Sequence, residues 1–395
     1  MLNNRQLFLL NTAQTSESPR LIEIEWSEGV YLFGPNGERY IDLVSGFAVS
    51  NIGHRHPKVI EAISAQLNKY LHVTVYGEFV QAPQVQFATE LLAELPDQLN
   101  SVYFTNSGTE ATEGAMKVTK KFTGRSEIIA AEKAYHGSTQ GALSLMGNDE
   151  YHRAYGPLLP GIRFIRYNNI NDLTWITEAT AAVILEAIQG EAGVRVPDPA
   201  YMQAVRKRCD EVGALLVFDE IQTGFGRTGT LFAFEQYDVV PDVLLLAKGM
   251  GGGMPIGAFV ANKRVMDVIK NNPMLGHITT FGGHPVSCAA ALAALHVIRD
   301  EHLLPGVEKK SQLFRKQLKH PAIREIRGKG LMLCLQLDTF SQVEKVSKYC
   351  AAHGVMVDWF LHCETALRIA PPLTIDESEI QAACTVILAA LDSLA

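Results

Sequence analysis

The chain has 395 residues, of which 47% are hydrophobic, so it can bury a large core spread over about two to three domains. Its formal net charge is −7, from 42 acidic and 35 basic residues without a run of like charge, which argues against nucleic acid or an anionic membrane as a partner. Apolar runs such as VLLLA and ALLVF are too short to span a bilayer, and the N-terminal stretch lacks the pattern of a signal peptide.

The first predicted elements are a β-hairpin and a helix. The strands VYLF and RYIDL flank GPNGE, in which Asn36-Gly37 is a strong turn signal. The segment HPKVIEAISAQLNKYL follows, and its apolar residues recur at helical spacing after Pro57.

The segment from about 101 to 263 predicts a mainly parallel α/β sheet. Short apolar runs alternate there with helical patterns such as TEATEGAMKVTKKF and YMQAVRKRCDEVG. Continuous rather than alternating hydrophobicity is expected where helices cover both faces of a sheet. The predicted strands are SVYFT, EIIAAE, IRFIRY, AAVILEAI, ALLVFDE, VLLLAK and GAFVAN.

After about residue 290 the pattern becomes helix, strand, helix, strand and final helix. The segments are PVSCAAALAALHVI, LMLCLQL, VEKVSKYCAAHG, ALRIA and SEIQAACTVILAALDSL. We therefore predict a large domain over 56–285 and a small α+β domain over 286–395, which residues 1–55 join. The sequence contains no internal repeat and no low-complexity linker.

Polar residues follow several of the predicted strands directly. They are Asn106-Ser107-Gly108, Glu186, Asp219-Glu220 and Lys248. Ligands of parallel sheets bind at the carboxyl ends of the strands, so we expect these residues to surround a binding site.

The stretch Gly224-Phe225-Gly226-Arg227-Thr228-Gly229 matches the dinucleotide pattern GxGxxG. That fingerprint requires its first glycine directly after a strand and its third inside a helix. Here Ile221-Gln222-Thr223 intervene after the strand, and TLFAFEQYDVVPD beyond it is a poor helix. The context argues against a nicotinamide site.

Neither the cysteines nor the histidines predict a metal site. The six cysteines form no CxxC pair, which favours reduced thiols in a cytoplasmic protein. His54 and His56 are close together in GHRHP, but no third ligand stands at a suitable spacing.

A lysine, an acid and a helix N-terminus at three strand ends suggest a pyridoxal phosphate site. A carboxylate such as Asp219 is costly at the end of an apolar strand unless a cation or donor meets it. Lys248 takes the corresponding position one strand later, before the glycine-rich GMGGGMPIGA. The strand, loop and helix of VYFTNSGTEATEGAMKV can bind a phosphate at the helix N-terminus.

The sequence also resembles the class III aminotransferases of the ornithine and acetylornithine type. The resemblance runs over essentially the whole chain and rests on NSGTEATEGAMK, YHGSTQGALS, VFDEIQTGFGRTG, LLLAKGMGGGMPIGA and TTFGGHPVSCAAALA. It implies the aspartate-aminotransferase-like fold (fold type I of the pyridoxal-phosphate-dependent transferases), with a large, mainly parallel seven-stranded sheet domain. It also implies a homodimer with shared active sites.

The resemblance implies a role for each cofactor-binding residue. Lys248 matches the Schiff-base lysine, and Asp219 matches the acid that contacts the pyridine nitrogen. Both would be catalytic. Gln222 matches the residue at the phenolic oxygen, and Tyr135 matches the aromatic on the ring, with His136 in support. The phosphate would be bound by Ser107, Gly108, Thr109 and, from the partner subunit, Thr280, next to Thr279.

Substrate residues follow from the same resemblance. Arg368 in LRIAPP matches the α-carboxylate binder, and Glu191 in QGEAG matches an acid that pairs with it when the donor presents a terminal amine. Ser138 stands where acetylornithine, succinylornithine and 4-aminobutyrate enzymes have an arginine, which favours diamines or differently recognised amino acids. Phe47, Val49 and Tyr76 are candidates for the substrate wall.

The sequence therefore predicts a pyridoxal-phosphate-dependent aminotransferase that transfers an amino group to a 2-oxo acid such as 2-oxoglutarate. The amino group would be the terminal amine of a diamine or a basic amino acid. An aminomutase, racemase or decarboxylase on the same fold is the alternative, and a nicotinamide-dependent dehydrogenase is a remote one.

Overall fold

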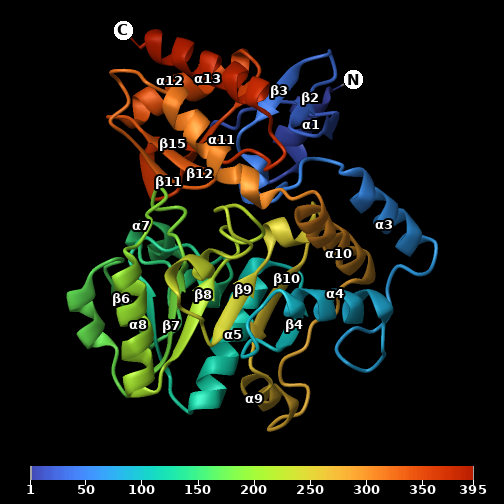
Figure 1. The fold of residues 1–395 in the computed structure, drawn as a ribbon, viewed down its shortest axis with the longest axis vertical. Coiled ribbons are helices and arrows are strands. Elements are labelled where there is room, and N and C mark those ends of the chain that lie inside the picture. The colour runs from blue at the N-terminus through green and yellow to red at the C-terminus, as the bar shows by residue number, and fades with distance from the viewer. Residues whose placement is uncertain (1, 395) are drawn as a thin grey trace.

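The computed structural model describes residues 2–394 and has two regions (Figure 1). The lower region in this view contains the large sheet, and the upper region contains both chain ends. Within the described residues, no helix combines the length and apolarity needed to cross a membrane.

The large sheet has seven strands, as predicted. Their spatial order is β4 (Ser101–Thr105), β10 (Gly257–Ala261), β9 (Val243–Leu246), β8 (Leu215–Asp219), β7 (Thr180–Glu186), β5 (Glu127–Ala131) and β6 (Ile162–Ile165). β10 runs antiparallel to both of its neighbours, and the remaining pairs are parallel. The prediction of a mainly parallel sheet is therefore confirmed.

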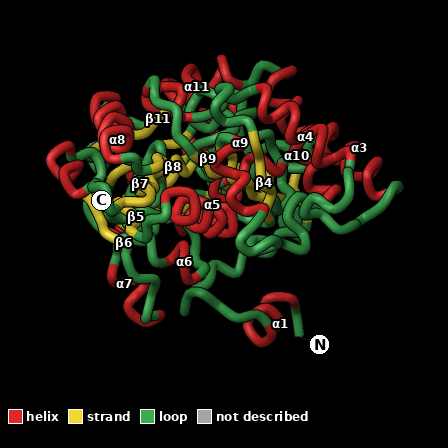
Figure 2. The backbone as a smooth tube through the Cα atoms, turned by 90° about the horizontal axis from the view of Figure 1, so that it is seen from below, coloured by secondary structure: helices red, strands yellow, loops and turns green. Residues whose placement is uncertain are grey.

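Helices cover both faces of this sheet. α5 (Gly108–Thr123) and α8 (Pro199–Val212) lie on opposite sides of it (Figure 2). Successive strand residues point to opposite faces, so Ile128 packs in the core that contains α5 and Ile129 in the core that contains α8. Both isoleucines are fully buried, which explains why the strands read as continuous apolar runs.

The N-terminal hairpin is confirmed and belongs to a small sheet. β1 (Trp26–Glu28), β2 (Tyr31–Phe33) and β3 (Arg39–Asp42) are antiparallel, and β13 (Val355–Met356) pairs with β3 in parallel. A strand near the N-terminus is therefore hydrogen-bonded to a strand from the C-terminal part of the chain.

The C-terminal part forms a second small sheet of antiparallel strands. Its order is β11 (Glu325–Lys329), β12 (Met332–Gln336), β15 (Cys363–Ile369) and β14 (Asp358–Phe360). The helices α11 (Leu304–Gln317), α12 (Phe340–Ala352) and α13 (Glu377–Asp392) share a core with it.

Three further helices pack together beside the large sheet. α10 (Pro285–Asp300) contacts both α3 (Pro57–Leu67) and α4 (Ala82–Ala93). The boundaries at 55/56 and 285/286 remain predictions. The other helices are short: α1 (Asn4–Asn11), α2 (Ser45–Ala48), α6 (Gln140–Leu143), α7 (Asp149–His152) and α9 (Lys263–Met266).

Candidate active site

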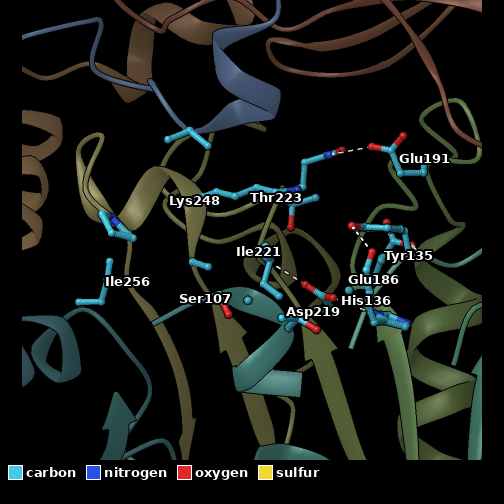
Figure 3. Close-up of a pocket in the computed structure, with 18 of the residues that line it drawn as sticks. Ser107, Tyr135, His136, Glu186, Glu191, Asp219, Ile221, Thr223, Lys248 and Ile256 are labelled. Carbon is cyan, nitrogen blue, oxygen red and sulfur yellow. Dashed lines mark hydrogen bonds and ion pairs between the residues drawn. The ribbon is translucent and has the colours of Figure 1, made fainter. Parts of the chain in front are cut away.

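A cavity of about 520 Å³ lies at the carboxyl ends of the large sheet's strands (Figure 3). The predicted strand-end residues Ser107, Glu186, Asp219 and Lys248 all line it. The other lining residues are Val49, Asn106, Gly108, Thr109, Tyr135, His136, Gly137, Ser138, Ile188, Glu191, Ile221, Gln222, Thr223, Ala247, Gly253, Met254, Pro255 and Ile256.

Lys248 extends into this cavity from the end of β9. Its φ angle of 48° lies in the left-handed region, which non-glycine residues seldom adopt. The side chain points across the cavity toward Thr223 (Figure 3). Burial lowers the pKa of Lys248, although the Glu191 carboxylate opposes the shift. A larger fraction of the amine is therefore neutral, which is the nucleophilic form.

Asp219 is held at the end of β8 by two donors. The imidazole of His136 donates from Nδ1 to Asp219 Oδ2 at 2.7 Å, and the Ile221 backbone N–H donates to Oδ1 at 2.9 Å. Burial opposes the charged imidazole, but the hydrogen bond to Asp219 raises the pKa of His136. The sequence predicted only a supporting role for His136, and the structure identifies its contact.

Glu186 has a role that the sequence did not reveal. It is the register partner of Asp219 on the neighbouring strand. Its carboxylate accepts from the backbone N–H of Tyr135 at 3.1 Å and of Gly190 at 2.6 Å. Burial raises the pKa of Glu186 to about 7. Through these two hydrogen bonds Glu186 connects the loop that carries Tyr135 to the loop that carries Glu191.

The N-terminus of α5 forms one wall of the cavity. Ser107 is its N-cap, and the Ser107 hydroxyl accepts from Glu110 N at 3.4 Å. The hydroxyls of Thr109 and Thr139 are 2.7 Å apart. A Cβ atom on Gly108 would lie 2.7 Å from Ile221 Cδ1, so a larger residue would crowd Ile221, which also lines the cavity. The backbone N–H groups of this first turn can bind an anion.

Arg368 and Glu191 form a buried ion pair beside the cavity. Arg368 donates from one terminal nitrogen to both carboxylate oxygens, at 2.7 and 2.8 Å. The guanidinium lies 4.5 Å from the Phe360 ring and 5.0 Å from the Phe47 ring. Although burial favours the neutral acid, the Arg368 charge lowers the pKa of Glu191 to about 2.

Of the remaining predicted residues, Gln222 lines the cavity, whereas Thr280 and Tyr76 do not. Gln222 lines it and donates from Nε2 to Glu191 Oε1 at 3.2 Å. Thr280 and Tyr76 are not among the lining residues of this chain. The hydroxyl of Thr279 accepts from Asn106 Nδ2 at 3.1 Å, whereas Thr280 is exposed.

These groups fit pyridoxal phosphate. Gln222 Oε1 and His136 Nε2 are buried and have no hydrogen-bond partner among the described residues. An orphaned buried polar atom is costly, and a polar ligand relieves that cost. The amine of Lys248, the carboxylate of Asp219 and the α5 N-terminus match the aldehyde, ring nitrogen and phosphate of this cofactor, respectively.

Glu220, next to Asp219 but outside the cavity, makes stability depend on pH. Burial raises its pKa from 4.5 to about 7. The folded chain therefore binds a proton that the unfolded chain releases, so this group's contribution falls as the pH rises from 4.5 to 7, by up to about 3 kcal/mol. Relative to the native protein, Glu220→Gln should lower the Tm more at pH 5 than at pH 8. Calorimetry showing the same Tm difference at both pH values would contradict this.

Comparison with known proteins places this chain among the aminotransferases. Residues 12–391 match the family model described as aminotransferase class-III. The chain is 40% identical over 376 residues to the acetylornithine aminotransferase of Caldanaerobacter subterraneus, covering 91% of this chain and 92% of that one. It is 42% identical over 360 residues to the enzyme of the same name from Methanosarcina mazei, covering 89% and 87%.

Solved structures of aminotransferases share the fold of this chain. The ornithine aminotransferase of Toxoplasma gondii superposes with a TM-score of 0.91 at 31% identity, covering 100% of this chain and 96% of that chain. A thermostable omega-transaminase of Thermomicrobium roseum gives a TM-score of 0.92 at 28% identity, covering 100% and 99%.

The fold and the cavity thus define a pyridoxal-phosphate-dependent transferase of fold type I. The chain belongs to the class III aminotransferase family. The fold class, the cofactor and the aminotransferase activity predicted from the sequence are confirmed.

Proposed function

We propose that Lys248 Nζ holds the cofactor and then moves the proton at the donor carbon. When bound, pyridoxal phosphate supplies an aldehyde for the amine and a ring that accepts electrons from that carbon. The burial of Lys248 and its lowered pKa support this role, because only the neutral amine is a nucleophile and a base.

The other cavity residues orient the ring and its phosphate. Asp219 holds the proton on the pyridine nitrogen, and its hydrogen bond to His136 fixes the carboxylate in place. Tyr135 and Gln222 also line the cavity; Tyr135 would contact the cofactor ring and Gln222 would bind its phenolic oxygen. Ser107, Gly108 and Thr109 bind the phosphate through the first turn of α5, and their position at the cavity wall supports this.

The enzyme is a homodimer in this proposal, and Thr280 binds the partner's phosphate. Large apolar side chains are exposed on two neighbouring segments: Leu71, Phe79 and Val80 on one, and Met274, Leu275, Ile278 and Phe281 on the other. The rings of His72 and Phe281 lie 4.8 Å apart, so the segments form one surface that also carries Tyr76. Light scattering should give twice the chain mass of 43.4 kDa, and the mass of a single chain would contradict the dimer.

The cavity's charges favour a donor with a terminal amine and no second carboxylate near Ser138. The acids Glu186, Glu191 and Asp219 line the cavity, and Lys248 is the only lysine or arginine among the described lining residues. The Ser138 hydroxyl lies 3.3 Å from that of Tyr135 and carries no charge. We therefore propose a diamine or a basic amino acid as the donor, whereas the two relatives are acetylornithine aminotransferases.

Arg368 and Glu191 let the same site accept two kinds of substrate. With a 2-oxo acid such as 2-oxoglutarate, Arg368 binds the α-carboxylate in a bidentate manner. With a terminal amine donor, Glu191 neutralises the guanidinium, as it does in the 2.7 Å contact. This pairing avoids a buried unpaired charge, which supports the proposal.

A donor screen tests the substrate class. The cofactor-loaded enzyme is mixed with putrescine, ornithine or acetylornithine, and the cofactor absorbance and the carbonyl product are followed in a single turnover. We expect putrescine or ornithine to react faster than acetylornithine. Ser138→Arg should raise kcat/KM for acetylornithine at least about tenfold, because a charge-assisted contact contributes about 1.5–3 kcal/mol.

Two outcomes of the screen would count against this proposal. Faster turnover of acetylornithine by the native enzyme would contradict the substrate class. Consumption of a donor without release of a carbonyl product would contradict transamination and favour an aminomutase. Ser138→Ala serves as the matched control, since it removes the hydroxyl without adding a charge.

We place the enzyme in the cytoplasm. All six cysteines are free thiols and five of them are buried, which supports a reducing compartment. Recovery of the native enzyme in a periplasmic or extracellular fraction would contradict this.

A further inference from the structure

The glycine-rich stretch at 224–229 surrounds a buried arginine rather than a nucleotide. Arg227 is fully buried, with 0% of its surface exposed. Gly226 has a φ of 88°, and a Cβ atom there would lie 2.7 Å from Leu373 Cδ1. The glycine therefore lets the loop approach the segment that follows β15.

The guanidinium of Arg227 has no carboxylate as a hydrogen-bond partner among the described residues. It donates to Leu331 O at 2.9 Å, to Pro371 O at 2.5 Å and to Asn51 Oδ1 at 2.6 Å. Burial lowers the pKa of Arg227 to about 9, and Asp42 opposes the shift only in part. A buried cation paired with uncharged oxygens is costly, so its retention calls for a specific role.

Two of these three oxygens lie next to the ends of the strands around Arg368. Pro371 follows Arg368 closely at the end of β15. Leu331 stands directly before β12, where Cys334 is the register partner of Arg368. The backbone N–H of Leu331 also donates to Arg227 O at 3.0 Å. Arg227 therefore binds both strands of the sheet segment that carries Arg368.

The third oxygen connects Arg227 to the Lys248 side of the cavity. Asn51 donates from Nδ2 to Phe225 O at 2.9 Å, and its backbone oxygen accepts from Leu373 N at 2.7 Å. A Cβ atom on Gly249 would lie 2.5 Å from Asn51 Nδ2. Asn51 thus packs against the residue that directly follows Lys248.

We propose that Arg227 is a positioning residue, which sets the place of Arg368 relative to Lys248 by holding Leu331, Pro371 and Asn51 together. This inference rests on the proposed role of Arg368 in binding a carboxylate. A lysine keeps the positive charge at position 227 but lacks the planar fork that reaches several oxygens at fixed angles. Because two of the three contacts lie on the Arg368 side, carboxylate binding should suffer more than reaction with an amine.

The test compares Arg227→Lys with Arg315→Lys in the holoenzyme. Arg315 also donates to two backbone oxygens, those of Ile326 and Gly328, but lies outside the cavity. Calorimetry measures the Kd of glutarate, which has two carboxylates and no amine or ketone to react. Stopped-flow absorbance measures the half-reaction with putrescine, which has no carboxylate.

We expect Arg227→Lys to raise the glutarate Kd at least about tenfold and to slow the putrescine reaction less than about threefold. Arg315→Lys should leave both values within about twofold of the native enzyme. An unchanged glutarate Kd, or an equal loss in both assays, overturns the positioning role. If Arg227→Lys does not fold, Asn51→Ala removes one acceptor and should raise the Kd about threefold; an unchanged Kd in that variant also overturns it.

Arg368→Ala separates this inference from the function on which it rests. If that variant binds glutarate weakly and Arg227→Lys binds it normally, the inference fails and the carboxylate role of Arg368 stands. If Arg368→Ala binds glutarate as tightly as the native enzyme, the proposed role of Arg368 fails and the inference falls with it.

Discussion

Lys248→Ala should abolish transamination, with kcat lowered at least about 1,000-fold. The variant loses both the nucleophile and the proton-transfer base, and Lys248 is the only lysine among the described lining residues of the cavity. Burial lowers the pKa of Lys248, which favours the neutral amine that both roles require. The visible absorbance of the bound cofactor should shift as well, because the covalent attachment is gone.

Single-turnover kinetics with an amine donor measure this loss. Lys348→Ala is the control, because Lys348 pairs on the surface with Glu344 at 2.8 Å and should leave kcat unchanged. A Lys248→Ala variant that retains more than about a tenth of the native kcat would contradict the proposed role of Lys248.

Asp219→Asn should reduce kcat by about 10- to 1,000-fold. A carboxylate beside the pyridine nitrogen raises the pKa of that nitrogen by about 1–3 units, at about 1.4 kcal/mol per unit, and an amide does not. The imidazole of His136 would also lose its charged acceptor at 2.7 Å, so the pKa of His136 should fall. The half-reaction rate and a pH titration of His136 by NMR measure the two effects.

Asp242→Asn is the matched control for this substitution. Asp242 accepts from Arg206 and from the Leu216 backbone N–H, both at 2.8 Å, and lies outside the cavity. Its replacement should lower stability without slowing the half-reaction. Equal rate losses in the two variants would mean that Asp219 acts only through folding.

The large sheet was predictable because continuous apolar runs in the sequence mark its strands. β7 is buried on both faces, and its residues from Ala181 to Leu185 are all apolar before Glu186 ends the run. A polar residue that ends such a run marks the edge where ligands bind, which is why Asp219 and Lys248 were found. The context of the glycine fingerprint argued against a dinucleotide site at 224–229, and the structure has turns rather than a helix at these residues.

Two of the longer helices, α4 and α11, were missed because their apolar faces are narrow. In α4, only Pro83, Phe87 and Leu91 are buried, and the helix depends on contact with α10. In α11, only Val307, Ser311 and Phe314 are buried. Where tertiary packing rather than periodicity decides, a single sequence gives little signal.

The contacts of the site that could not be read from sequence motifs involve backbone groups or residues far apart in the sequence. Glu186 binds the backbone N–H groups of Tyr135 and Gly190, which any residue would supply. The contact between Arg368 and Glu191 joins residues 177 positions apart, so only the family resemblance suggested it. Arg227 likewise holds three segments that are distant in the sequence.

The most direct test of the active-site assignment is to fix the cofactor to the enzyme and locate it. The holoenzyme is reduced with borohydride and digested, and the peptides are examined by mass spectrometry. We predict a single cofactor-modified peptide with the modification on Lys248. A modification on another lysine, or none on any peptide, would contradict the assignment.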